Sequence, residues 1–288
     1  MTKIACVQSN VVFADPAANT AKAIDHLRML KKEGVELVVF PEAYLTGYCV
    51  DSAEAAGKIA IDARSSYIEE LRQTCEGLDM MAVVGFAESE GLGLEAQGSG
   101  EGNSSLFNTA VLFEPGQAPR FYRKSHLPEL GLDKFVCGGH GPLEVFDTRI
   151  GKIGILICFD MRPPEAARVL ALNGAQLLVL PTNWPEGAET NADHTAITRA
   201  MENRIFVATC DRVGEENGFK FIGRSKIVDP SGKVLASADD TEKVLVADLD
   251  LDLANRKRVI TIPGKYELEV FKARRPELYG DLTRNLGS

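Results

Sequence analysis

Three side chains that could carry out acyl-transfer chemistry each lie at the end of a predicted strand of this 288-residue sequence. Cys158 follows KIGILI, Glu42 follows ELVVFP, and Lys124 closes RFYRK. A cysteine thiolate can attack a carbonyl or nitrile carbon, and a nearby carboxylate can take the thiol proton and pass one to the departing amine. An ammonium group can stabilise the resulting oxyanion, together with the backbone N–H of Phe159 directly after the nucleophile. If the three side chains converge, the sequence predicts a cysteine-dependent hydrolase that needs no histidine.

Each of these residues also has a purely structural interpretation, which the sequence alone leaves open. Cys158 could be a small buried hydrophobic residue, Glu42 a glutamate exposed on a loop rim, and Lys124 a solvated surface cation. Their positions favour the functional interpretation, because α/β sheets bind ligands outside the carboxyl ends of their strands. Whether the three residues meet depends on the elements that carry them.

A strand, a turn and a helix are predicted around Cys158. The apolar run Lys152–Ile157 is typical of a buried strand. A turn-like FDMR follows, and Pro163-Pro164 suits the first turn of a helix, where a missing N–H costs little. The helix is expected to continue through EAARVLALN and to end at Gly174. Cys158 would then lie near a helix N-terminus, whose dipole favours a thiolate and lowers the pKa of the thiol.

The remaining elements alternate strands with helices on both sides of residues 89–105, a stretch rich in Gly, Ser and Glu that is expected to be a flexible surface insertion. A hairpin is expected over Leu106–Phe113 and Arg120–Lys124, which would make the sheet mixed rather than parallel. Further strands are predicted at Lys3–Gln8, Glu36–Phe40, Met80–Phe86, Gln176–Pro181, Ile205–Cys210, Gly223–Val228, Val234–Ala238 and Val244–Asp248. This order favours one α/β domain with two sheets flanked by helices.

Two segments after expected strands could line a substrate pocket. Tyr48 belongs to the aromatic-rich YLTGY loop that follows Glu42. Asn183 and Trp184 come directly after the strand Gln176–Pro181. Trp184, the only tryptophan of the chain, either lines the pocket or is an ordinary core or interface anchor.

Composition excludes several other classes of protein. Apolar residues make up 45% of the chain and the net charge is −9, with dispersed basic residues, so nucleic acid and anionic membranes are poor partners. No apolar run approaches the roughly 20 residues that span a bilayer, and no signal-peptide pattern is present. Six scattered cysteines without a C-x-x-C pair and four distant histidines argue against disulfides and against a metal site, and they favour a cytoplasmic location.

The chain resembles the carbon–nitrogen hydrolase (nitrilase) superfamily over essentially its whole length. The resemblance rests on motifs that occur in the family's order: FPEAYLTGY around Glu42, YRKSHLPE around Lys124, GILICFDMRPPE around Cys158, then RAMENRIFVATCDRVG, GRSKIVDPSGKVL and RRPELY. It implies a four-layer αββα sandwich of two mixed β-sheets flanked by helices, a Glu42-Lys124-Cys158 triad and no cofactor. It also implies a homodimer or larger assembly of a single domain over residues 1–288. The basic tail from about residue 256 would then lie at a subunit interface.

Members of this family often use a second acidic residue shortly after the lysine to position the substrate. Glu129 is the better match to that position, and Asp133 is the alternative. Arg162, four residues after the nucleophile, could pair with a substrate carboxylate in bidentate fashion or with an internal carboxylate such as Asp160 or Glu165.

Hydrolysis of a small linear amide to a carboxylate and ammonia through a thioester is the first expectation. The substrate is therefore a small molecule. An N-carbamoyl amine or amino acid amidohydrolase is a close second. A nitrilase, an amide-forming acyltransferase and a non-catalytic scaffold remain as alternatives.

Overall fold

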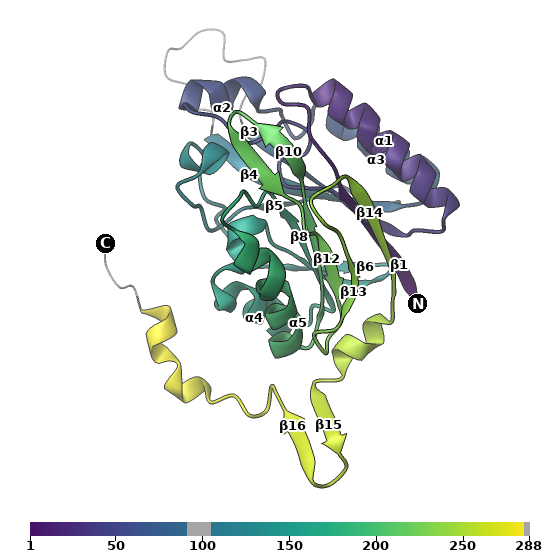
Figure 1. The fold of residues 1–288 in the computed structure, drawn as a ribbon, viewed down its shortest axis with the longest axis vertical. Helices are drawn as coiled ribbons and strands as arrows, with labels where there is room; N and C mark the ends of the chain where they lie inside the picture. The colour runs from purple at the N-terminus through teal and green to yellow at the C-terminus, as the bar shows by residue number, and fades with distance from the viewer. Residues whose placement is uncertain (91–104, 285–288) are drawn as a thin grey trace.

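The computed structural model describes residues 1–90 and 105–284 (Figure 1), so most of the expected insertion at residues 89–105 lies outside the described residues. A six-stranded sheet has the order β14-β1-β2-β3-β4-β5. These strands are β14 (Lys243–Leu249), β1 (Thr2–Gln8), β2 (Leu37–Val39), β3 (Met81–Glu90), β4 (Ser105–Phe113) and β5 (Arg120–Arg123). The neighbours β1, β2 and β3 are parallel, and the remaining pairs are antiparallel.

A second six-stranded sheet has the order β13-β12-β9-β8-β7-β6. These strands are β13 (Val234–Ser237), β12 (Lys226–Val228), β9 (Phe206–Asp211), β8 (Leu177–Thr182), β7 (Gly151–Ile155) and β6 (Val145–Thr148). The central strands β7, β8 and β9 are parallel, and the outer pairs are antiparallel. Both sheets are therefore mixed, as the predicted hairpin required.

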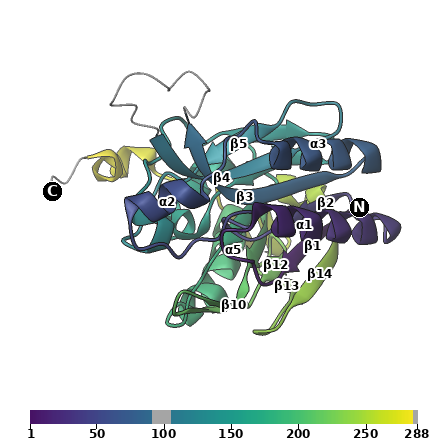
Figure 2. The same ribbon diagram turned by 90° about the horizontal axis from the view of Figure 1, so that it is seen from above.

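The two sheets pack face to face, and helices cover their outer faces. Val39 and Val83 of the first sheet share one buried core with Ile155 and Val179 of the second. The helices α1 (Pro16–Lys32) and α3 (Ser66–Leu78) lie side by side on the first sheet (Figure 2), and α4 (Pro164–Leu172) and α5 (Ala196–Asn203) cover the second. The four-layer αββα sandwich is thereby confirmed.

Local sequence explains why the elements begin and end where they do. Asp15 caps α1, because its carboxylate accepts a hydrogen bond of 2.9 Å from the backbone N–H of Ala18. Pro16 occupies the first helical turn. Gly34 then takes φ of +76°, the left-handed backbone that favours glycine after a helix. The chain can therefore turn directly into β2.

Several elements were not expected from the sequence, among them the strand β6 and the following three features. One is the helix α2 (Ala53–Ile59), and another is the hairpin of β10 (Val213–Glu216) and β11 (Phe219–Ile222). The third lies in the C-terminal tail, which contains a hairpin of β15 (Arg258–Ile262) and β16 (Tyr266–Glu269) that projects from the body in Figure 1. Pro263 and Gly264, the latter with φ of +71°, make its turn.

Candidate active site

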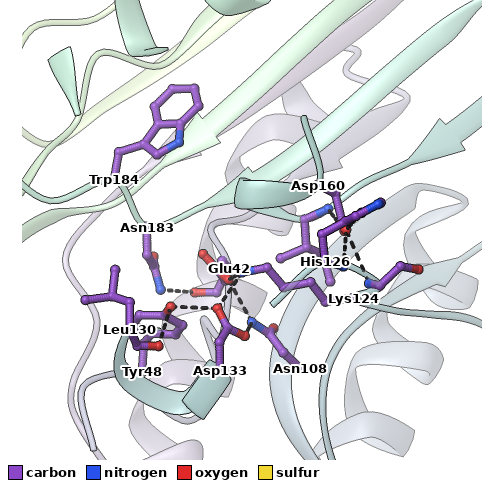
Figure 3. A network of polar contacts seen from close by, with 12 residues as sticks. Glu42, Tyr48, Asn108, Lys124, His126, Leu130, Asp133, Asp160, Asn183 and Trp184 are labelled. Atoms are coloured by element: carbon purple, nitrogen blue, oxygen red, sulfur yellow. Dashed lines mark hydrogen bonds and ion pairs between the residues drawn. The ribbon is translucent and has the colours of Figure 1, made fainter. Parts of the chain in front are cut away.

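The two sheets place the predicted chemical residues at one end of the sandwich. Glu42 follows β2 and Lys124 follows β5 of the first sheet, whereas Cys158 follows β7 and Asn183 follows β8 of the second. The side-chain amide of Asn183 donates a hydrogen bond of 3.0 Å to the backbone carbonyl of Glu42 and so joins the two sheets here (Figure 3).

Lys124 lies buried between two carboxylates. Its ammonium group is 2.8 Å from Glu42 Oε1 and 2.5 Å from Asp133 Oδ2, and all three side chains are fully buried (Figure 3). Burial alone lowers the pKa of Lys124, but the two carboxylates outweigh it and hold the pKa well above its usual value. Lys124 is therefore a fixed positive charge at neutral pH.

Glu42 is a buried carboxylate with one free oxygen. Its Oε1 accepts hydrogen bonds from Lys124 and from the side-chain amide of Asn108, the latter at 2.7 Å. Among the described residues, its Oε2 has no hydrogen-bond partner. Burial raises the pKa of Glu42, while Lys124 and Asn108 oppose that rise. A carboxylate with a raised pKa and a free oxygen is suited to accept a proton.

Cys158 occupies a strained turn between β7 and α4. Its φ is +45°, a left-handed conformation that costs energy for a residue with a side chain. Burial and the negative charge of Glu42 raise the pKa of the thiol, whereas Lys124, the Thr182 side chain and the Asn183 backbone lower it. Glu42 and Lys124, the two proposed partners of Cys158, thus both influence the pKa of its thiol.

The predicted lowering of the thiol pKa by a helix dipole is wrong. A 3₁₀ turn over Cys158–Met161 separates the cysteine from α4, which begins only at Pro164. The favourable effect of a helix N-terminus is confined to its first turn, so it does not compensate for burial. The resting thiol is protonated at neutral pH and needs a base.

The structure favours Asp133 over Glu129 as the second acid, because Asp133 contacts Lys124 whereas Glu129 is exposed. Gly131, with φ of +49°, opens a 3₁₀ turn over Gly131–Lys134 that folds Asp133 inward. The Asp133 carboxylate also accepts hydrogen bonds of 2.7 Å from the Tyr48 hydroxyl and 2.9 Å from the Asn108 amide. Tyr48 therefore supports Asp133 and does not line the cavity described next, contrary to its predicted role.

A cavity of about 340 Å³ opens over the cysteine. Its walls include the predicted residues Cys158, Phe159, Arg162, Asn183 and Trp184. Trp184 is held by its backbone, which donates a hydrogen bond of 2.8 Å to Asp211 and accepts one of 3.0 Å from Ile222. Trp184 thus lines the cavity and also belongs to the buried core under α4 and α5, so both interpretations that the sequence left open apply. The volume suits a small molecule.

Arg162 lies exposed at the cavity, with no ion pair within 4.0 Å to any residue of the described ranges. The internal pairing considered from the sequence does not form. The Asp160 carboxylate is buried and contacts Tyr122 and His126 instead. The Glu165 carboxylate is not within ion-pair distance of Arg162. The guanidinium group is therefore available to a ligand.

Two supporting residues escaped the sequence analysis. Asn108 bridges Glu42 and Asp133, and its only sequence signal is a polar residue within the apolar strand SLFNTAVLF. Glu216 accepts hydrogen bonds from the backbone N–H groups of Tyr48 and Cys49 at 2.7 and 2.6 Å and pairs with Arg212 at 2.7 Å. The unexpected β10–β11 hairpin therefore braces the loop after Glu42.

Within residues 1–90 and 105–284, no group of three or more His, Cys, Asp or Glu side chains is arranged to hold a metal ion. The same part of the chain contains no helix with both the length and the apolar character needed to cross a bilayer.

Comparisons with known proteins agree with this architecture. A model of the carbon-nitrogen hydrolase family matches residues 3–258. A nitrilase of Pyrococcus abyssi is 36% identical over 97% of this chain and 99% of its own length. An (R)-stereoselective amidase of a Pseudomonas species is 32% identical over 98% of this chain and 95% of its own. A solved amidase of a Nesterenkonia species shares the fold, with a TM-score of 0.79 over 98% of this chain and 96% of its own at 24% identity. The chain therefore belongs to the carbon-nitrogen hydrolase family and is a hydrolase of carbon–nitrogen bonds other than peptide bonds.

Proposed function

We propose that the protein hydrolyses a small linear amide to a carboxylate and ammonia through a thioester on Cys158. One observation carries the proposal: a fully buried ammonium group, Lys124, lies between the Glu42 and Asp133 carboxylates and acts on a thiol that opens into a small cavity. A lysine that only needed solvation would not be buried.

In the acylation step, Glu42 takes the thiol proton and the Cys158 sulfur attacks the amide carbon. The oxyanion of the tetrahedral intermediate is stabilised by the Lys124 ammonium and by the backbone N–H of Phe159. When the intermediate collapses, the carbon–nitrogen bond breaks and the nitrogen takes the proton from Glu42. Ammonia leaves, and the acyl group remains on sulfur.

In the deacylation step, Glu42 takes a proton from water as the water oxygen attacks the thioester carbon. The same two donors stabilise the second oxyanion. Collapse expels the Cys158 sulfur, which recovers its proton from Glu42. The sum of both steps is amide plus water to carboxylic acid plus ammonia. Asp133 remains beside Lys124 throughout and keeps its ammonium charged and in place.

Arg162 supports a substrate that carries a carboxylate away from the scissile bond, because its planar guanidinium can bind a carboxylate through two hydrogen bonds. The same feature supports the second candidate, an N-carbamoyl amino acid, whose carbamoyl carbon would form a thiocarbamate on the same sulfur and yield amine, CO₂ and ammonia. In a mutant of the Nesterenkonia amidase, the acetamide moiety of fluoroacetamide adds covalently at the active site cysteine, which supports the sulfur as nucleophile here.

Ammonia release across a panel of linear amides, N-carbamoyl compounds and nitriles tests the proposal, with Cys158→Ala as the blank. We expect the wild type to release ammonia from amides and Cys158→Ala to release none. An added amine that is incorporated into product in place of water would identify an acyltransferase. Identical behaviour of wild type and Cys158→Ala on every compound would leave only a scaffold.

The assembly belongs to the same proposal, with a homodimer or larger homo-oligomer that buries the tail from about residue 256. Its support is the exposed apolar side chains of the β15–β16 hairpin, among them Ile260, Ile262 and Leu268. Sedimentation of the full chain beside a chain ending before residue 256 tests it. A full chain that sediments as a monomer would contradict it.

A further inference from the structure

We propose that His126 is a positioning residue which, through Asp160, fixes the segment of Lys124 against the turn of Cys158. The role rests on the proposed function, because Lys124 and Cys158 are the residues that must meet for acyl transfer. Neither His126 nor Asp160 belongs to the triad, and neither lines the cavity over the cysteine.

Asp160 is the point at which the two segments join. From the lysine segment, its carboxylate accepts hydrogen bonds from the backbone N–H groups of Ser125 and His126 at 3.2 and 2.8 Å and from the Tyr122 hydroxyl at 2.8 Å. Figure 3 shows His126 beside Asp160. From the cysteine segment, it accepts the backbone N–H of Ile157 at 3.0 Å. Asp160 is completely buried. One carboxylate therefore sets the separation of the chain at Lys124 from the chain at Cys158.

His126 adds to this junction a contact whose side chain ordinarily titrates near neutral pH. Its Nδ1 lies 2.7 Å from Asp160 Oδ1, and 38% of its side chain is exposed. An ionised carboxylate only accepts hydrogen bonds, so Nδ1 carries a proton whether the ring is neutral or charged. Titration therefore occurs at Nε2. The neutral ring keeps the hydrogen bond, and the charged ring adds an ion pair.

The charged groups that act on the ring are both acidic. Asp160, on the turn after Cys158, is the larger influence, and Glu165 of α4 is the smaller one. Hydrogen bonding to Asp160 raises the pKa of His126, although partial burial opposes the rise. Lys124, two residues before His126, is turned into the Glu42–Asp133 cluster. The junction is therefore strongest below the His126 pKa and loses its ion pair as the pH rises through it.

Two variants separate a positioning role from a merely structural one. His126→Asn can place an amide N–H where Nδ1 lies but cannot titrate, whereas His126→Ala removes the donor. His194→Ala is the matched control, because His194 is exposed and lies in the helical turn Asn191–Thr195, outside the junction. Thermal unfolding of each variant verifies the fold.

The readout is the rate of alkylation of Cys158 by iodoacetamide, followed by peptide mass spectrometry over a range of pH, beside an NMR titration of the histidine ring. Burial makes the thiol a poor nucleophile, so its reactivity depends on a correctly placed Lys124. His126→Ala should react about tenfold more slowly or worse, because small misplacements at a reacting centre cost about 10²-fold. His126→Asn should stay within a few-fold of the wild type and lack the inflection that the wild type shows at the His126 pKa.

A wild-type rate and inflection in His126→Ala, or a His126 pKa at or below its usual value, would overturn the positioning role. If His126→Ala does not fold, the presence or absence of the inflection in His126→Asn decides. Alkylation needs no substrate. Absence of ammonia release from every compound of the panel would therefore refute the proposed function without affecting this test.

Discussion

The ammonium nitrogen of Lys124 lies 2.8 Å from Glu42 Oε1, with both side chains fully buried. Such a pair is expensive to bury and is costly to break from one side only. Its remaining neighbours are polar: Asp133 shares the ammonium, and Asn108 binds both carboxylates. The cluster leaves Glu42 Oε2 free among the described residues, which is the oxygen that the proposed proton transfers require.

Replacement of Lys124 by alanine should reduce turnover by about 10²–10³-fold, the usual cost of losing one oxyanion donor. It should also reduce the free energy of unfolding, because it leaves two buried carboxylates without a counter-ion, a loss of about 3–5 kcal/mol in comparable cases. Ammonia release and urea unfolding measure the two effects. Lys58→Ala, which removes an exposed ion pair with Glu54, is the matched control. Turnover close to the wild-type value in Lys124→Ala would contradict the oxyanion role.

The two acids after Lys124 should differ in how strongly kcat falls when each carboxylate is replaced by its amide. Asp133→Asn removes a charge that holds the ammonium, so kcat should fall by at least about tenfold, whereas Glu129→Gln changes an exposed side chain and should leave kcat within a factor of about two. Steady-state kinetics of both variants on one substrate measure the difference. The reverse order of effects would restore Glu129 as the second acid.

Arg162→Ala should raise KM for a carboxylate-bearing substrate by about tenfold to a hundredfold, because a charged hydrogen bond contributes about 1.5–3 kcal/mol. The KM for an amide of the same length without the carboxylate should hardly change. Arg162→Lys should recover only part of the loss, since an ammonium cannot bind a carboxylate in bidentate fashion. An equal rise in KM for both substrates would assign Arg162 to cavity shape instead.

Asp211 should make the protein less stable as the pH rises. Burial raises the pKa of Asp211 well above its usual value, and its Oδ2 has no partner among the described residues. A carboxyl whose folded pKa exceeds its unfolded pKa contributes stability at low pH and loses it as the pH rises through the folded pKa. Asp211→Asn cannot ionise, so its free energy of unfolding relative to the wild type should increase with pH.

Urea unfolding of both proteins across the pH range measures that difference. Subtraction of the two curves removes the contribution of all other titrating groups that the substitution leaves unchanged. A difference that does not vary with pH would show that Asp211 ionises normally in the folded protein.

The positions of Glu42, Lys124 and Cys158 could be predicted because each follows a strand that the sequence indicates, and the strands of a mixed sandwich end at shared edges. The choice between Glu129 and Asp133 could not, because it depends on a 3₁₀ turn that begins at a left-handed Gly131. Local backbone geometry of this kind leaves no periodic pattern in the sequence.

Two further features needed coordinates. The β10–β11 hairpin was missed because VGEE, the sequence of β10, has too few apolar residues to predict a strand. For the same reason, the contact of Glu216 with the loop that contains Tyr48 was not predicted. The thiol pKa was predicted in the wrong direction because Cys158 was expected to lie close to a helix N-terminus despite the FDMR turn, whereas α4 begins only at Pro164. The depth of burial, which dominates that pKa, is a tertiary property.

The most direct test of the account is to quench the wild-type protein with acid during turnover of its best amide and to map the peptides by mass spectrometry. We predict the acyl mass on the peptide that contains Cys158, and neither adduct nor ammonia from Cys158→Ala. Ammonia released by Cys158→Ala at the wild-type rate, or an acyl group on another residue of the wild type, would contradict the role of Cys158 as nucleophile.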